Sequence, residues 1–149
     1  MPRVPRVPRV PRVPEHIISR EVLKWLKNEF MENKEFGKSL EMRTKKFAIS
    51  IIRLSSSLPQ SVESKVIRNQ ITKSGTSIGA NYREANRSRS EPDFGNKISI
   101  CESESSETGY WLEIIEELNW LEKHGIDPVK DESNELLAIF TSIGKNLKH

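Results

Sequence analysis

Apolar and small side chains recur every three or four residues through most of this chain, which is the spacing of a helix with one buried face. The first clear run follows Ser39, a residue type favoured at helix N-caps, and ends before Pro59. Its members are spaced in a 4-3-4-3-4 pattern: Leu40, Thr44, Phe47, Ile51, Leu54 and Leu58. We therefore predict a helix over roughly residues 39–58.

A second helix is predicted from Ser61 to about Arg87. Its buried face is expected to contain Ile67, Ile71, Ser74, Ile78 and Ala85. At about 100° per residue, a row of basic side chains falls on the opposite side of this helix. These are Lys65, Arg68, Lys73, Arg83 and Arg87.

Two more helices follow from the same periodicity. The third is predicted from Ser90, where Asp93 completes a capping-box pattern and Pro92 lies in the first turn, to about His124, with Gly125 as its stop. Its buried face would comprise Phe94, Ile98, Cys101, Ser105, Thr108, Leu112, Ile115 and Asn119. The fourth would begin with Asp127 as N-cap and Pro128 as first residue. It would bury Leu136, Phe140, Ile143 and Leu147.

The N-terminal region has a different character. Residues 1–14 repeat Pro-Arg-Val and end on Pro14, so helix is forbidden there and an extended or disordered basic tail is expected. This tail is either a low-complexity extension or an arm that contacts nucleic acid or a partner. Residues 15–33 have the pattern of a short amphipathic helix, and Gly37 with the polar residues before it weakens its continuation. We therefore predict a tail (1–14), an extra helix (15–33) and a bundle domain (34–149).

Four amphipathic helices with short connections predict an all-α fold, an antiparallel up-down-up-down four-helix bundle, and no strand is expected. The single cysteine, Cys101, forbids an internal disulfide and favours a cytoplasmic location. No stretch is apolar enough to span a bilayer.

Charge is segregated along the chain although the net charge is only +3. Residues 40–90 carry ten basic and three acidic residues, whereas residues 91–149 carry five basic and thirteen acidic residues. A basic half and an acidic half can face each other within one subunit or across subunits, and the basic half can also face nucleic acid.

Three segments resemble a known family: Phe47–Leu54, Ser74–Ala85 and Glu107–Leu112 occur in the order and at the separations found there. The family is that of four-helix bundle proteins encoded in intervening sequences of bacterial 23S ribosomal RNA genes, with the accessory protein of diversity-generating retroelements. The resemblance covers roughly Met31 to His149. It implies a left-handed bundle that forms a ring, commonly a pentamer, without known catalysis. For the retroelement members it implies binding of nucleic acid and reverse transcriptase through a basic surface.

The block from Ser74 to Ala85 is the most specific of these segments. Gly75 and Gly79 form a small-xxx-small pair, which predicts a close helix–helix contact rather than a membrane motif, because Lys73 and Arg83 flank it. Asn81 and Glu84 lie at the edge of the apolar face, where they either join a hydrogen-bond network with Ser77, Thr108 or Tyr110 or contact a ligand. The candidate packing residues are Gly75, Ser77, Ile78, Gly79, Asn81 and Glu84.

Basic residues of the first two predicted helices form a candidate nucleic-acid surface, which could equally be a solvated face or a subunit contact. Its members are Lys45, Lys46, Arg53, Lys65, Arg68, Lys73, Arg83, Arg87 and Arg89. Large aromatic side chains mark contact patches, so a subunit interface is expected to use one of the pair Trp111 and Trp120, with Tyr110 or Leu121.

No set of residues has the types and spacing of a catalytic site, and no cofactor or small-molecule ligand is predicted. Glu102, Glu104 and Glu107 form an acidic cluster, but the Glu-x-x-His pattern of di-iron bundles is missing and the three histidines are scattered. Cys101 lies on the apolar face, which indicates a buried, inert thiol. The sequence therefore predicts a non-enzymatic homo-oligomeric interaction protein, with a nucleic-acid-binding accessory protein as the alternative.

Overall fold

The computed structural model describes residues 20–147, with side chains described from residue 33 onward. Four helices make up the fold: α1 (Arg20–Ser56), α2 (Val62–Ala85), α3 (Glu91–Glu117) and α4 (Lys123–Leu147). No strand occurs within residues 20–147. The all-helical prediction is thus confirmed, while the Pro-Arg-Val tail lies outside the described residues.

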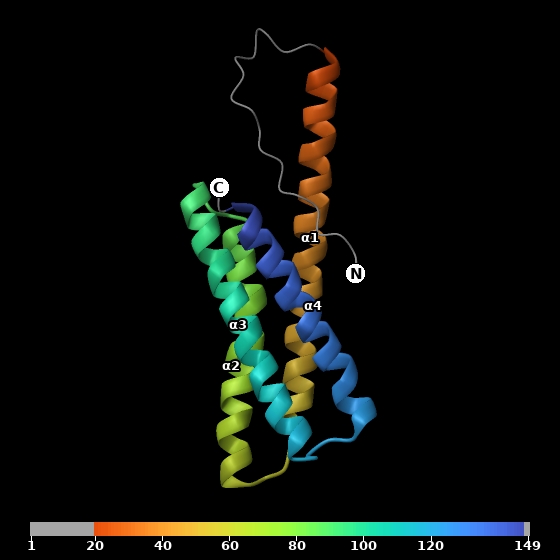
Figure 1. The fold of residues 1–149 in the computed structure, drawn as a ribbon, viewed down its shortest axis with the longest axis vertical. Coiled ribbons are helices and arrows are strands. Elements are labelled where there is room, and N and C mark those ends of the chain that lie inside the picture. Colours follow the sequence, from red (N-terminus) through yellow and green to blue (C-terminus); the bar gives the residue numbers. More distant parts are fainter. Residues whose placement is uncertain (1–19, 148–149) are drawn as a thin grey trace.

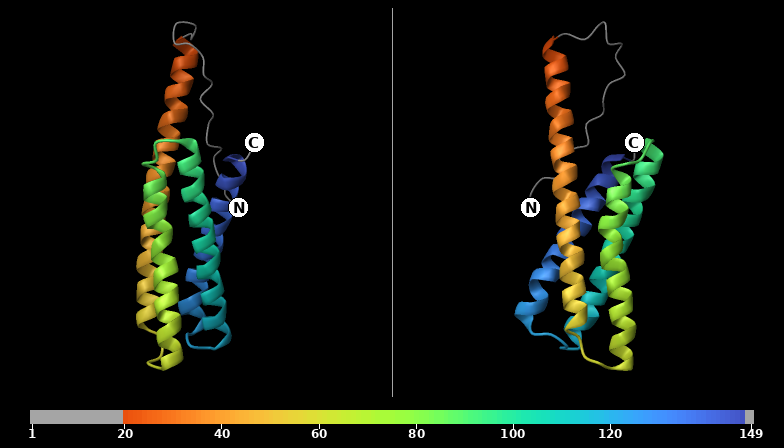
Figure 2. Two further views of the ribbon diagram at one scale, coloured as in Figure 1. Left: turned by 90° about the vertical axis from the view of Figure 1, so that its left-hand side faces the viewer. Right: turned by 180° about the vertical axis from the view of Figure 1, so that it is seen from behind.

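The four helices occupy the corners of a square. Helix α1 packs against α2 and α4, and α3 packs against the same two helices, so that α1 and α3 lie diagonally across the bundle. The loops after α1 and α3 lie at one end of the bundle, and the loop after α2 lies at the other (Figures 1 and 2). The α1/α2 side of the molecule is therefore opposite the α3/α4 side.

The core consists of the stripes that the spacing predicted. All six members of the first stripe, from Leu40 to Leu58, are buried. In α2, α3 and α4 the predicted stripes are also buried over most of their length, with Ile67, Phe94 and Leu147 packed half-buried at the margins. Tyr82 is a core residue that the periodicity did not select, and its ring meets Phe140 edge-on at 5.6 Å between centroids.

The expected separate helix over residues 15–33, and the helix start at Ser39, are wrong. Residues 20–56 form one continuous helix, whose N-terminal part projects past the other three helices (Figure 1). The cause is visible in the core pattern: Phe36 is half-buried against the core and Leu40 is buried, so the apolar stripe continues through the polar region around Gly37. This packing outweighs the cost of a helical glycine, about 1 kcal/mol.

The predicted N-caps of α2 and α3 are confirmed. The Ser61 hydroxyl accepts a hydrogen bond from the backbone N–H of Ser64, and the Ser90 hydroxyl accepts one from Asp93. Each satisfies one of the backbone donors that a helix start leaves unpaired.

The predicted end of the third helix near His124 is wrong, because α3 stops at Glu117. Asn119 has a φ of 54°, and the backbone N–H groups of Asn119 and Trp120 bond to the carbonyls of Glu116 and Ile115. This is a Schellman motif with asparagine in the left-handed position, where glycine is more usual. Asn119 is therefore exposed in the turn and not part of the buried face.

The start of the fourth helix at Asp127 and Pro128 is also wrong. Helix α4 begins at Lys123, so Gly125 and Pro128 lie inside it. The backbone N–H groups of Gly125 and Ile126 both bond to the carbonyl of Glu122, which closes the first turn before the proline is reached. The proline then removes one internal hydrogen bond in the second turn.

Candidate interaction surfaces

The paired glycines of α2 lie against α1. A Cβ atom placed on Gly75 would be 2.8 Å from both Cγ atoms of Ile51, and one on Gly79 would be 3.0 Å from Thr44 Oγ1. Ile51 and Thr44 are fully buried, so neither can move aside freely. The absence of a side chain at these positions sets the distance between the two helices. Ile78 is on the same helix and is fully buried in the core.

Polar groups next to the glycines are hydrogen-bonded inside the bundle. Thr108 Oγ1 of α3 lies 2.9 Å from Ser74 Oγ of α2, and the two hydroxyls are hydrogen-bonded in a fully buried position. The Asn81 side-chain amide donates to the backbone carbonyl of Ser77 at 2.9 Å, and the Ser77 hydroxyl donates to the carbonyl of Lys73. These contacts are local to α2, so Asn81 does not join Thr108 or Tyr110.

Glu84 forms an ion pair with Lys97 of α3, with Nζ 2.6 Å from Oε2. The ion pair connects the C-terminal end of α2 to the N-terminal part of α3. The positive charge of Lys97 partly compensates the negative charge of the Glu84 carboxylate. Glu84 therefore contributes little free negative charge to the surface around it.

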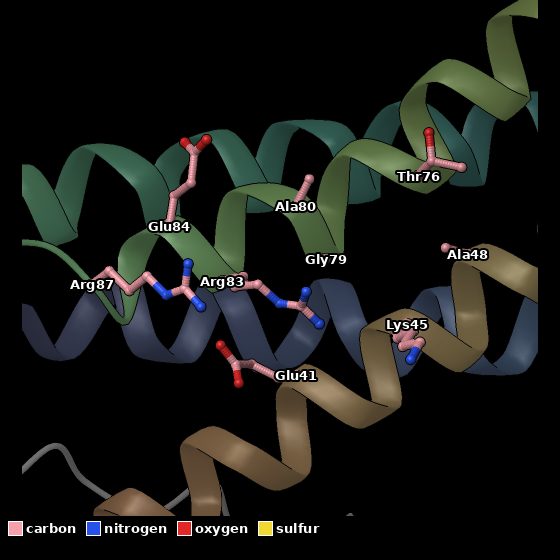
Figure 3. Close-up of a pocket in the computed structure, with 9 residues that line it drawn as sticks. All are labelled: Glu41, Lys45, Ala48, Thr76, Gly79, Ala80, Arg83, Glu84 and Arg87. Carbon is pink, nitrogen blue, oxygen red and sulfur yellow. The ribbon is translucent and has the colours of Figure 1, made fainter.

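Three of the predicted basic residues meet over the α1/α2 contact. Lys45, Arg83 and Arg87 line a groove of about 460 Å³ together with the carboxylates of Glu41 and Glu84, and we call it the basic groove. Figure 3 shows Arg83 of α2, and Arg87 in the turn after α2, reaching toward Glu41 of α1, while Glu84 points away. The same groove is lined by the small residues Ala48, Thr76, Gly79 and Ala80. Small side chains there leave the cationic groups accessible along the hollow between the helices.

The other predicted basic residues do not line this groove. Lys46 and Arg53 are exposed on α1, and Lys65, Lys73 and Arg89 are exposed on α2 and the loop after it. Arg68 is half-buried and donates to Gln60, so it has a structural role at the other end of α2. The predicted basic surface is therefore broad, and only three of its residues line one groove in the structure.

The opposite side of the molecule carries an acidic groove between α3 and α4, of about 750 Å³. It is lined by Glu102, Glu107, Tyr110, Leu137 and Thr141, together with Ser99, Ser103 and Ser106. The Thr141 hydroxyl donates to Glu102 at 3.3 Å and holds that carboxylate at the groove wall. Beside the groove, partial burial raises the pKa of Glu104 and the nearby Glu107 carboxylate raises it further, while Lys73 acts in the opposite direction.

The predicted interface aromatics differ in exposure. Tyr110 is 56% exposed, whereas Trp111 and Trp120 are half-buried against the core. The Tyr110 and Trp111 rings meet edge-on, with 5.0 Å between their centroids, so the exposed Tyr110 ring packs against the half-buried Trp111 ring. Of the three, only Tyr110 offers a large apolar surface to a partner.

Among the side chains described, those of residues 33–147, no group of three metal-ligating residues comes together. No helix within residues 20–147 is long and apolar enough to cross a membrane. Cys101 is fully buried, and burial raises the pKa of its thiol to about 12. A thiol that stays protonated is a poor nucleophile.

Comparison with known proteins assigns the chain to a protein family. Residues 39–142 match the family described as 23S rRNA-intervening sequence protein. A crystal structure from Bacteroides thetaiotaomicron, of a protein with unknown function from the S23 ribosomal protein family, is 35% identical with a TM-score of 0.66. The match covers 70% of this chain and 97% of that one. No curated protein matches the chain. On the strength of a match over most of its length, this chain belongs to the 23S rRNA-intervening sequence protein family.

Proposed function

We propose that this protein is a non-catalytic homo-oligomeric scaffold, an antiparallel up-down-up-down bundle that assembles head to tail into a closed ring in the cytoplasm. The resemblance to ring-forming relatives favours a pentamer. The observation that carries the proposal is the position of the charge. The basic segment, residues 40–90, builds the α1/α2 side, and the acidic segment, residues 91–149, builds the opposite α3/α4 side.

Opposite charge on opposite sides favours one mode of association. Two copies that meet through the same side repel each other, whereas the α1/α2 side of one copy attracts the α3/α4 side of the next. Such a contact is heterologous and can be repeated, and it produces a ring when the rotation between neighbours closes.

Light scattering coupled to size-exclusion chromatography tests this at low-micromolar concentration. We expect a single mass corresponding to a small integral number of subunits at low salt, and a shift toward smaller species at high salt, because exposed charges are screened. A monomer at low salt contradicts the proposal.

The basic groove supports an alternative function, a nucleic-acid-binding accessory protein. Lys45, Arg83 and Arg87 lie together along one hollow, and the Glu84 carboxylate next to them is already paired with Lys97. Cationic groups along a groove suit a phosphate backbone, and such binding is independent of sequence and weakened by salt.

Filter retention of labelled RNA and DNA, measured as a function of salt, tests the alternative. The R83E/R87E variant is expected to lose retention while keeping its oligomeric mass, whereas the K65E/K145E variant, with the same charge change outside the groove, is expected to retain most of it. Failure of the unchanged protein to bind at about 50 mM salt, where phosphate contacts are strong, removes this alternative.

A further inference from the structure

The outward face of α1 carries a regular row of apolar and basic side chains. Met42, Lys46, Ile49 and Arg53 are spaced by 4, 3 and 4 residues, which places them on one line along the helix. Each lies two residues after a member of the buried stripe, so this line faces away from the core. Met42 is 61% exposed and Ile49 is 40% exposed. We call these four residues the α1 ridge.

The acidic groove has the complementary features. Glu102 and Glu107 supply negative charge, while Tyr110 and Leu137 supply apolar surface. The serines along α3 at positions 99, 103 and 106 are small, so a helix from outside can approach closely. The groove runs along α3 from Ser99 to Tyr110, and this length of about 16 Å equals the length of the ridge from Met42 to Arg53.

We propose that the α1 ridge of one copy of this chain seats in the acidic groove of the next copy. This deepens the proposed oligomeric scaffold and rests on it. Lys46 and Arg53 lie against Glu102 and Glu107, while Met42 and Ile49 cover the apolar surface of Tyr110 and Leu137. The occupant is a second copy because the same chain carries a ridge and a groove that match in charge, apolar content and length.

The position of the two surfaces also favours closure. The ridge lies at the α1 corner of the square, and the groove lies on the α3/α4 side, so the two are not diametrically opposite. Each contact therefore turns the next copy by the same angle, which gives a ring rather than a straight fibre when the turns complete a circle. The basic groove does not take part and stays open toward solvent.

Charge reversal on the full chain tests the pairing. The ridge variant K46E/R53E and the groove variant E102K/E107K each place like charges in contact, so we expect the concentration for half-assembly to rise at least about 100-fold in each. The combined variant, with all four changes, restores opposite charges and is expected to assemble at a concentration close to that of the unchanged chain. The variants K65E and E113K/E117K alter exposed charges away from the ridge and the groove, so they are expected to change this concentration much less than the ridge and groove variants do.

Masses come from light scattering, and circular dichroism checks that each variant is folded. An unchanged chain that is monomeric overturns the scaffold and this inference together. Reversal variants that keep the oligomeric mass overturn the ridge-and-groove contact while leaving the scaffold in place. Two monomeric reversal variants without recovery in the combined variant overturn the pairing of these charges.

Discussion

Gly75 of α2 lies directly against the side chain of Ile51 of α1, so that an added Cβ would come within 2.8 Å of two Ile51 carbons. This contact joins two residues 24 positions apart and lies in the middle of the helix pair. The Ile51 atoms concerned are next to its backbone, and the residue is fully buried, so relief would require one of the helices to move.

Replacement of Gly75 by alanine is therefore expected to destabilise the protein by about 1–3 kcal/mol through overpacking, reduced by the better helix propensity of alanine. Urea unfolding followed by circular dichroism measures the change. The matched control is G95A, because a Cβ at Gly95 in α3 meets nothing within 4 Å. That change is expected to stabilise the protein by about 0.5–1 kcal/mol. A G75A protein as stable as G95A would show that the helices are not in close contact here.

The buried hydrogen bond between Thr108 and Ser74 gives a second prediction. The T108V variant keeps the shape of the side chain but removes the hydroxyl, so a loss of about 1 kcal/mol in the free energy of unfolding is expected. In the S74A/T108V double variant the loss should be smaller than the sum of the two single losses, since both remove the same bond. Additive losses would mean that the hydroxyls do not interact.

The salt bridge between α1 and α4 gives a third prediction. Arg43 donates two hydrogen bonds from Nε and Nη2 to Glu132, and Nη2 also contacts Glu135. Because the Arg43 and Glu132 side chains are only 31% and 29% exposed, R43Q is expected to cost about 1 kcal/mol, less at high salt. The control is K65Q on α2, whose exposed side chain has no ion pair within the described part of the chain. It should be nearly neutral in the same unfolding experiment.

Two buried groups predict a loss of stability at high pH. Burial raises the pKa of Cys101 from 9.0 to about 12 and that of Tyr82 from 10.0 to about 12. In the unfolded chain both groups ionise at lower pH, so the unfolded state binds fewer protons above about pH 9 and stability falls as the pH rises toward 12. Well below pH 8 both groups are protonated in the folded and the unfolded state, so they contribute no pH dependence there.

Unfolding measured from about pH 8 to pH 11 should show this fall, and the C101A variant should show a shallower one, since one of the two titrating groups is removed. An equal slope in both proteins would mean that the thiol is not buried as described.

The sequence alone determined the secondary structure of the bundle and the buried stripes. Leu40, Phe47 and Ile51 were selected by spacing, since the period of a helix fixes which side chains share a face. The family was also readable from the block around Gly75 and Gly79. The segregation of charge into a basic and an acidic half was likewise present in the linear order of residues.

The helix ends were decided by packing and by one unusual turn. Gly37 does not interrupt α1, because Phe36 and Leu40 carry the stripe through it. Asn119 ends α3, and the signal that could have found it was an asparagine followed by the apolar Trp120, a pattern of Schellman turns. The spacing pointed instead to Gly125, which lies inside α4.

Which residues from different helices meet depends on how the helices pack in three dimensions. Lys45 lines one groove with Arg83 and Arg87 because the contacts of Gly75 with Ile51 and of Gly79 with Thr44 set the register and the distance of α1 and α2. Glu102 and Tyr110 face Leu137 and Thr141 because α4 packs against α3. Periodicity is a property of a single helix and fixes its faces. Grooves are formed by two helices, and their composition depends on how closely and in what register the backbones pack.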